Sequence, residues 1–301
     1  MPASVAKSPE DQKGLDAGQT RSTLLAWYDA NHRDFPWRET RDPYAVLVSE
    51  VMLQQTQASR VAERFGRFMA RFPTAASLAA AAPATVLAEW SGLGYNRRAL
   101  ALQRACASVA ANGWPREVVA LERLPGVGPY TARAVASLAF GTPVGVVDTN
   151  VRRWLLRRFA VTDAPRSLQQ LADLLAAASD GRAADWTHAT MELGAAICRP
   201  RNPKCSGCPI RDGCPSRDRA ATVPVPRQAA LRGSDREVRG ALLKRLSAAP
   251  AHRLDEAEAR TAIGAGLADA RWQRILASLE RDGLLHRSSE GLGLGAATIG
   301  A

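Results

Sequence analysis

Lysine is almost missing from this sequence. Of the 40 basic residues among 301, only four are lysines, and none lies between Lys13 and Lys204. An enzyme that attacks its substrate through a lysine amine therefore has no candidate nucleophile in that stretch. No run of eighteen apolar residues occurs either, so we expect no segment that spans a membrane.

Cysteine is also scarce. Five cysteines, four of them within seventeen residues, do not suit a secreted disulfide scaffold, and they favour a reducing, cytoplasmic location. The first twenty residues are polar and lack the apolar core of a secretory signal. We expect residues 1–20 to form a disordered tail.

Negative charge is outweighed by positive charge. The chain carries 40 basic and 29 acidic residues, which gives a net charge of +11 and a pI near 10.2. Arginine meets phosphate oxygens through two parallel hydrogen bonds, so its excess favours a nucleic-acid partner. A GC-rich coding bias is the alternative explanation for the same arginines.

Strand-like alternation is nearly missing, and Val144–Val147 is the best short candidate. Apolar residues instead recur at three- and four-residue spacing between proline and glycine breaks, which predicts an all-α chain. The clearest helical stretches are Thr23–Tyr28, Ala45–Phe72, Pro83–Trp90, Arg97–Ala111, Thr131–Phe140, Val151–Phe159, Leu168–Ala178 and Thr187–Ile197.

The end of the chain reads as a separate small domain. Residues 220–232 have the composition of a linker, and residues 233–301 contain three predicted helices followed by a hairpin over Leu284–Leu294. This outline fits a winged helix, a common nucleic-acid module, and equally a small helical bundle that packs on the rest.

Four cysteines with the spacing C-x6-C-x2-C-x5-C indicate a metal centre: Cys198, Cys205, Cys208 and Cys214. Structural zinc sites usually show two C-x2-C pairs, and only one is present. Four unevenly spaced cysteines in one loop favour a [4Fe–4S] cluster. Cys106 stands apart at helical spacing with Leu102 and Val109, so we expect it to be buried packing.

A glycine-rich turn joins two helical stretches at Leu124–Ala132. Gly126 and Gly128 allow a tight turn and close backbone approach, and Pro129 suits the first turn of a helix. The free amides at that helix start can hold an anion. The pattern predicts a helix-hairpin-helix that grips a DNA phosphate, with a plain helical turn as the alternative.

The hairpin, Asp148 about twenty residues later and the cysteine loop occur in an order that resembles the helix-hairpin-helix, iron–sulfur DNA glycosylase superfamily. Pro36–Arg38, Ser49–Gln57 (SEVMLQQTQ) and Gly92–Tyr95 are similar to its adenine-specific, MutY-type branch. The resemblance implies a six-helix barrel over residues 35–144 and a cluster lobe made of residues 21–34 and 145–219. It implies a monomer that flips adenine out of double-stranded DNA, where adenine lies opposite 8-oxoguanine or guanine.

The resemblance also implies roles for individual residues. Glu50 would protonate adenine, which requires an apolar setting that favours the neutral acid, and Asp148 would stabilise an oxocarbenium-like sugar. Asp148 also suits the N-cap of the next helix. Tyr130 and Asn150 would support these groups. The base contacts would come from Trp37, Arg38, Gln55, Thr56, Tyr95, His188 and Glu192, and the phosphate contacts from Gly126, Gly128, Arg199, Arg201 and Lys204.

Two positions and one segment separate this chain from related patterns. Tyr130 stands where bifunctional glycosylase/lyases carry a lysine, which implies a monofunctional enzyme. His188 stands where the adenine-specific branch commonly has glutamine. Residues 227–301 are too short and too helical for the Nudix-like domain that usually recognises 8-oxoguanine. The alternatives are an endonuclease III-like pyrimidine-damage glycosylase/lyase and a non-catalytic iron–sulfur DNA-binding regulator.

Overall fold

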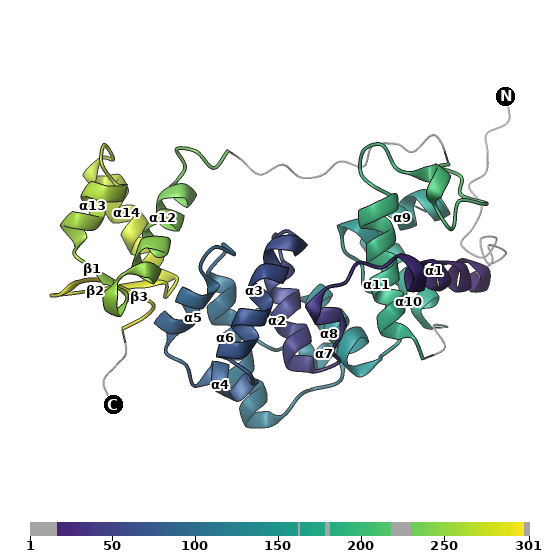
Figure 1. The fold of residues 1–301 in the computed structure, drawn as a ribbon, viewed down its shortest axis with the longest axis horizontal. Coiled ribbons are helices and arrows are strands. Elements are labelled where there is room, and N and C mark those ends of the chain that lie inside the picture. The colour runs from purple at the N-terminus through teal and green to yellow at the C-terminus, as the bar shows by residue number, and fades with distance from the viewer. Residues whose placement is uncertain (1–16, 162, 178–180, 218–229, 298–301) are drawn as a thin grey trace. The chain divides into compact units, whose positions relative to one another are not determined.

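A computed structural model describes residues 17–161, 163–177, 181–217 and 230–297, and they fold into helices with strands only near the C-terminal end of these ranges (Figure 1). The prediction of an all-α architecture with a small C-terminal domain is confirmed. Of the predicted tail, residues 1–16 lie outside the described residues, and residues 17–20 form the first turn of helix α1. Within the described ranges, no helix is both long and apolar enough to cross a membrane.

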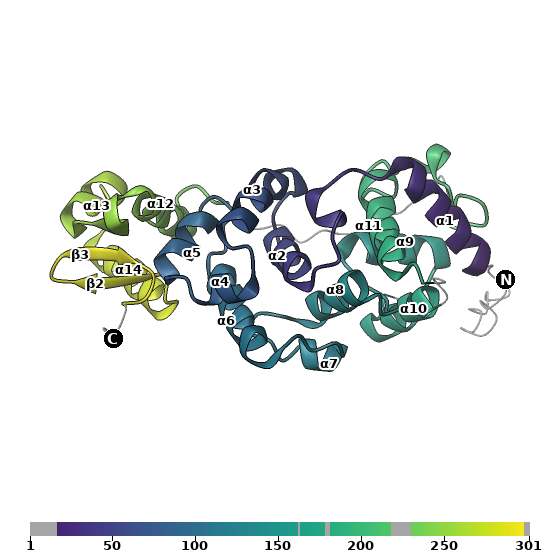
Figure 2. The ribbon, with the colours of Figure 1, turned by 60° about the horizontal axis from the view of Figure 1, so that its bottom comes forward.

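The chain divides into two compact units. The first unit contains residues 1–46, 116–122 and 128–226. Its elements are α1 (Ala17–Asn31), η2 (Pro36–Arg38), α7 (Val118–Leu121), α8 (Pro129–Phe140), α9 (Thr149–Phe159), α10 (Pro165–Ala177), α11 (Ala183–Glu192), the π-turn η3 (Leu193–Ile197) and η4 (Cys205–Gly207). Its core joins apolar positions of α1, α9, α10 and α11, which lie together in both views (Figures 1 and 2). Leu24, Trp154 and Leu168 are almost fully buried there.

The second unit contains residues 47–115, 123–127 and 227–301. Its first elements are α2 (Pro43–Leu53), whose first turn belongs to the first unit, α3 (Ala58–Arg71), α4 (Ala75–Ala79), α5 (Pro83–Trp90) and α6 (Arg97–Asn112). Local sequence explains the boundaries: Thr74 and Ser77 form a reciprocal capping box at α4, and Pro83 opens α5. Phe68 and Trp90 pack edge to face with ring centroids 5.8 Å apart in its core.

The C-terminal part of the second unit adds α12 (Asp235–Ala248), η5 (Pro250–His252), β1 (Arg253–Leu254), α13 (Glu256–Ile263), α14 (Asp269–Arg281), β2 (Leu285–Ser288) and β3 (Gly291–Leu294). The strands form an antiparallel sheet in the order β1-β3-β2, with Leu285 opposite Leu294. This helix–strand–helix–helix–strand–strand order is that of a winged helix. Of the predicted linker 220–232, residues 220–229 lie outside the described residues.

The winged helix packs against α5 through α12 and β3. The approach is close at Gly295, because a Cβ atom there would lie 3.2 Å from the backbone nitrogen of Ala84. Elsewhere the segment Val144–Val147, the best strand candidate, lies in no strand of the described part. It leads directly into α9, which places Asp148 at a helix start.

Candidate active site

Asp148 is the N-cap residue of α9. Its carboxylate accepts hydrogen bonds from the backbone N–H of Val151 at 2.6 Å and from the side-chain amide of Asn150 at 2.7 Å. The structure therefore places Asp148 at the N-cap position that the sequence predicts. Burial raises the pKa of Asp148, while the two hydrogen bonds and the charge of Arg153 act in the opposite direction.

Arg153 joins the Asp148 turn to the cysteine loop. Its guanidinium is buried and donates to the side-chain oxygen of Asn150 at 2.9 Å and to the carbonyl of Cys198 at 2.6 Å. It also donates to the carbonyl oxygens of Thr149 and Gly194. The orientation of Asn150, and through it that of Asp148, is therefore tied to the chain at the first cysteine. No sequence motif indicated Arg153.

A buried carboxylate, Glu192, lies at the end of α11 and is held by two arginines. Arg38 donates to Glu192 Oε2 at 2.7 Å, and Arg33 donates to both carboxylate oxygens, at 2.5 and 3.3 Å. Glu192 is 1% exposed, so these charge-assisted bonds offset the cost of burying its charge. Arg33 was missed in the sequence, although it stands beside the Pro36–Arg38 motif.

Aromatic rings surround the Arg38 guanidinium. Its central carbon lies 5.1 Å from the ring centroid of Phe35 and 5.7 Å from that of Tyr28. Trp37 is buried and stacks on Phe35, with centroids 4.7 Å apart and ring planes within 6°. Tyr28 and Phe35 were missed in the sequence because neither carries a motif by itself.

His188 belongs to the same cluster of side chains. Its ring lies 6.3 Å from that of Tyr28, and it is buried on α11 one turn before Glu192. Burial and the positive charges of Arg38 and Arg41 lower the pKa of His188 to about 3. The first unit thus brings four predicted base-binding residues together, namely Trp37, Arg38, His188 and Glu192, and it keeps the histidine uncharged at neutral pH.

The four clustered cysteines line one cavity of about 40 Å³. Arg157, Arg211 and Arg217 line the same cavity, and Arg157 lies 3.5 Å from the Cys198 sulfur. Four thiolates around one space, with cationic side chains beside them, fit an iron–sulfur cluster, because the arginines balance the negative charge of the ligands. Cys106 is fully buried on α6 in the second unit, as predicted for a packing residue.

Glu50 lies in the middle of α2, within the second unit. It is 4% exposed, and the residues around it on this helix, including Val46, Val51 and Met52, are buried as well. Burial is the setting that the predicted role of Glu50 as a proton donor requires. Asp148 belongs to the first unit.

The residues predicted to meet the opposite base lie on two loops of the second unit. Gln55 and Thr56 follow α2, and Tyr95 precedes α6. Gln55 and Tyr95 both have left-handed backbone conformations, with φ of 57° and 48°, and the Tyr95 side chain is 48% exposed. Such conformations cost free energy in residues other than glycine and persist where surrounding contacts hold them.

The hairpin has the conformation that its glycines predict. Gly126 has a φ of 76°, and a Cβ atom there would lie 2.6 Å from that of Ala101, so only glycine fits. Gly128 is the N-cap of α8, and both glycines are exposed. Tyr130 follows in the first turn of α8 and is half-buried.

The predicted phosphate contacts of the cysteine loop differ in exposure. Arg201 and Lys204 are exposed, whereas Arg199 is half-buried and donates to the carbonyl of Asn202 at 3.0 Å. The Arg199 carbonyl in turn accepts from Arg157 at 2.7 Å. Arg201 and Lys204 are therefore available to an anionic partner, and Arg199 also stabilises the loop.

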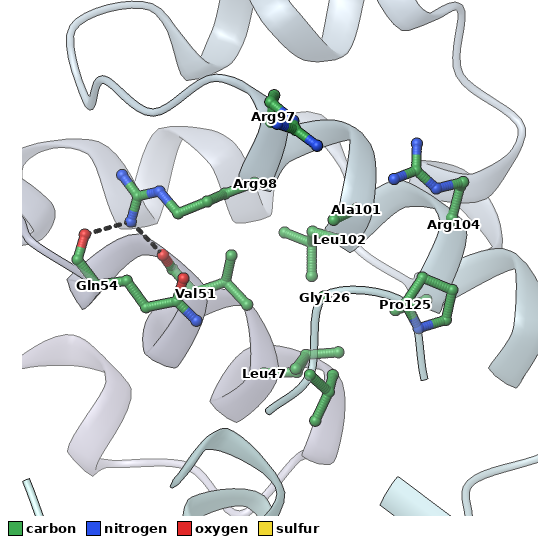
Figure 3. Close-up of a pocket in the computed structure, with 12 residues that line it drawn as sticks. Leu47, Val51, Gln54, Arg97, Arg98, Ala101, Leu102, Arg104, Pro125 and Gly126 are labelled. Carbon is green, nitrogen blue, oxygen red and sulfur yellow. Dashed lines mark hydrogen bonds between the residues drawn. The ribbon is translucent and has the colours of Figure 1, made fainter. Parts of the chain in front are cut away.

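A cavity of about 340 Å³ lies within the second unit between α2, α6 and the hairpin (Figure 3). Leu47, Val51 and Gln54 line it from α2 and the residue that follows. Three arginines of α6, Arg97, Arg98 and Arg104, line the other side. The cavity thus combines an apolar wall with a basic one, beside the loop predicted to bind phosphate.

Comparisons with known proteins agree with this arrangement. Residues 48–177 match the family described as HhH-GPD superfamily base excision DNA repair protein, and residues 198–214 match the iron–sulfur binding domain of endonuclease III. The second match confirms the prediction of an iron–sulfur cluster over zinc.

Several relatives share most of the chain. A protein named adenine DNA glycosylase from Mycolicibacterium smegmatis is 41% identical over 287 residues, which cover 89% of this chain and 93% of that one. Its namesake from Mycobacterium tuberculosis is 43% identical over 283 residues, 90% and 91% of the two chains. The human protein of that name is 39% identical over 262 residues, 77% of this chain and 48% of its own.

Solved structures resemble about two thirds of the chain. A thermostable thymine-DNA glycosylase matches with a TM-score of 0.63 and 32% identity over 67% of this chain and 97% of its own. A trapped endonuclease III–DNA covalent intermediate matches with a TM-score of 0.56 and 26% identity, over 67% and 96%. Both similarities confirm the predicted glycosylase fold.

Proposed function

The chain belongs to the adenine DNA glycosylase family of base excision repair, and we propose that it removes adenine paired with 8-oxoguanine or guanine in double-stranded DNA. The observation that carries this proposal is Glu50, a carboxyl group buried in the apolar helix α2. Neutral adenine is a poor leaving group and requires a proton on its ring, whereas thymine can leave as an anion. We further propose that the enzyme acts as a monomer on DNA in the cytoplasm.

Glu50 donates its proton to adenine N7 as the bond between C1′ and N9 breaks. The electron pair of that bond passes to the adenine ring, and the sugar becomes an oxocarbenium-like cation. Asp148, positioned by Val151 and Asn150, stabilises that cation electrostatically or through a transient bond to C1′. Water then adds at C1′, displacing Asp148 where that bond has formed, and the Glu50 carboxylate left after proton transfer accepts the proton of the water. Tyr130, near the start of α8, supports the sugar.

The flipped adenine is held by side chains of the first unit. Trp37 provides an aromatic face, and the Arg38–Glu192 pair provides a donor and an acceptor for the edge of the base. His188 is uncharged at neutral pH because of its lowered pKa, so one ring nitrogen donates and the other accepts. It can therefore replace the glutamine of related enzymes in either hydrogen-bonding role.

The opposite strand and the backbone are met by other residues. Gln55 and Thr56 contact the base opposite adenine, and Tyr95 enters the stack beside it. Gly126 and Gly128 bring backbone amides to a phosphate, and Arg201 and Lys204, with Arg199 beside them, add positive charge. The exposure of Tyr95, of both glycines and of the two cluster-loop cations supports these roles.

The reaction ends with base release. A lyase reaction through a Schiff base needs an amine, and the hairpin helix carries Tyr130 where such enzymes have lysine. The [4Fe–4S] cluster, bound by Cys198, Cys205, Cys208 and Cys214, holds the loop that Arg153 joins to the Asp148 turn. The cluster has no chemical part in the proposed steps.

The test is single-turnover base release from four duplexes, containing A·8-oxoG, A·G, T·G and thymine glycol·A. We expect wild type to release adenine from the first two, with strand scission only after alkali treatment. Glu50→Gln should reduce this release by at least about a thousandfold, because it removes the proton donor. Glu89→Gln is the matched control, since Glu89 is a largely covered glutamate of α5 that pairs with Arg67 of α3 and has no part in the proposed chemistry.

Other outcomes would favour the alternatives. Release of thymine glycol with scission before alkali indicates the bifunctional glycosylase/lyase. Binding of all duplexes without release of any base indicates a regulator. Equal rates for Glu50→Gln and wild type exclude Glu50 as the proton donor.

A further inference from the structure

Arg98 lies in the first turn of α6 and extends its guanidinium to the end of α2 (Figure 3). Its Nη1 donates to the carbonyl oxygens of Val51 at 2.6 Å and Met52 at 3.3 Å, and to that of Gln54. The last carbonyls of a helix lack partners within the helix and carry the negative end of its dipole. Arg98 therefore satisfies the end of α2, from which the loop with Gln55 and Thr56 continues.

The other terminal nitrogen of Arg98 reaches the second loop. Nη2 donates to the carbonyls of Gly94 at 3.0 Å and Leu93 at 3.3 Å. It also donates to Thr56 Oγ1 at 3.3 Å, and Thr56 Oγ1 donates to the Leu93 carbonyl at 3.4 Å. One guanidinium thus joins the loop after α2 to the loop before α6.

Two aromatic rings lie close to this guanidinium. Its central carbon is 5.5 Å from the ring centroid of Trp90 and 5.4 Å from that of Tyr95. Burial lowers the pKa of Arg98 to about 10, which still leaves it charged at neutral pH. The contacts with Tyr95 and Thr56 involve two of the three residues proposed to meet the opposite base.

We propose that Arg98 is the positioning residue for recognition of the base opposite adenine. It holds Gln55 and Tyr95 in their left-handed conformations by binding the carbonyls that precede them, those of Gln54 and Gly94, and it orients Thr56 directly. This inference rests on the proposed function, which assigns those three residues to the opposite base. Lysine cannot replace Arg98 in this role, because its single ammonium group cannot donate hydrogen bonds to both loops at once, as the two terminal nitrogens of the guanidinium do.

The experiment compares Arg98→Met and Arg98→Lys with Arg104→Met. Arg104 lies on the same helix and lines the same cavity, so its loss removes an equal charge without touching either loop. The first readout is hydrogen exchange of the amides in residues 53–57 and 92–96. We expect both segments to exchange at least about tenfold faster in the two Arg98 variants, and as in wild type in Arg104→Met.

The second readout is the single-turnover rate on the preferred adenine mispair divided by that on A·C. A displacement of about 1 Å at a positioning group costs up to about a hundredfold in rate, so we expect the ratio to fall at least about tenfold in both Arg98 variants. Arg104→Met should change the two rates equally and leave the ratio intact. Arg98→Lys keeps the charge, so it remains informative where Arg98→Met does not fold.

The two proposals fail in different ways. Wild type that releases no adenine overturns the proposed function, while hydrogen exchange still tests Arg98. Wild type that releases adenine, combined with unchanged exchange or an unchanged ratio in Arg98→Lys, overturns the role of Arg98 alone.

Discussion

The guanidinium of Arg97 lies 3.6 Å from the carboxylate of Asp282, which joins the start of α6 to the end of α14 in the winged helix. Asp282 also accepts from Arg239 of α12 at 2.6 Å. A carboxylate shared in this way connects the small C-terminal domain to the helix that carries Arg98. The winged helix therefore contacts the rest of the second unit next to the loops proposed to meet the opposite base, and we expect it to brace them.

Replacing Asp282 with alanine should weaken this brace. Arg239 would remain partly buried without its charged partner, so we expect the free energy of unfolding to fall by about 2 kcal/mol. Asp269→Ala is the control, since Asp269 is 92% exposed in its pair with Arg260 and should cost less than about 0.5 kcal/mol. Urea unfolding measures both, and equal losses would contradict a brace at Asp282.

The cap and the chemistry of Asp148 can be separated by two substitutions. Asparagine caps helices about as well as aspartate, so Asp148→Asn should keep the stability of α9, whereas Asp148→Ala should lose about 1 kcal/mol. Both variants lack the carboxylate and should lose adenine release. Urea unfolding measures the stability of both variants, and single-turnover assays on the same preparations measure adenine release. If Asp148→Asn still released adenine, helix capping would be the only role of Asp148.

Stability should depend on pH through the same carboxyl group. Burial raises the folded-state pKa of Asp148 above its ordinary value of 3.8, so the folded protein binds more protons between those two values. The neutral acid then stabilises the folded protein fully below pH 3.8, and this stabilisation is lost as the pH rises through the raised pKa. Wild type should lose stability relative to Asp148→Asn over that window, as measured by urea unfolding from about pH 3 to about pH 7. A constant difference would contradict this expectation.

Gly194, in the π-turn after α11, lies against the Asp148 turn. A Cβ atom at this position would lie 2.6 Å from the carbonyl oxygen of Asn150 and 2.7 Å from its Cβ. Gly194→Ala should displace the start of α9, at a cost of about 1–3 kcal/mol, and reduce adenine release. Gly66→Ala serves as the control, because nothing lies within 4 Å and alanine should stabilise α3 by up to about 1 kcal/mol. Similar thermal shifts for both would refute the steric account.

The cysteines should differ sharply in their effect on iron. Cys198→Ala removes a cluster ligand and should abolish the visible absorption and the bound iron and sulfide. Cys106→Ala removes a buried thiol in the second unit and should leave all three unchanged. Iron retained in Cys198→Ala would mean that another ligand replaces this cysteine.

Local sequence signals predicted most elements but not the break after α2. Apolar spacing runs through Ala45–Phe72 without interruption, yet α2 ends at Leu53 and α3 begins at Ala58. The break depends on Gln55 in a left-handed conformation and on Arg98, which lies more than forty residues later. The spacing of apolar residues indicates which residues are buried, but it does not predict a helix end that a side chain distant in the sequence stabilises.

The site shows the same division. Glu50, Asp148, Tyr130 and the cysteines could be predicted as site residues because each belongs to a short motif. Arg33, Tyr28 and Arg153 could not, because their partners Glu192, His188 and Cys198 lie between about 40 and 160 residues away in the sequence. His188 was noted as a departure, but only its burial beside Arg38 and Arg41 explains why it is uncharged.

The sequence by itself determined the helical class, the iron–sulfur cluster and the family, and it predicts the cluster ligands and the phosphate-binding hairpin, since these depend on residue type and local spacing. Tertiary structure alone decided which charges are neutralised: Glu192 by two arginines, Asp282 by two others, and the end of α2 by Arg98. The reason is physical. Burying a charge or an open helix end is costly unless a partner meets it, and the fold, by bringing distant segments together, supplies that partner.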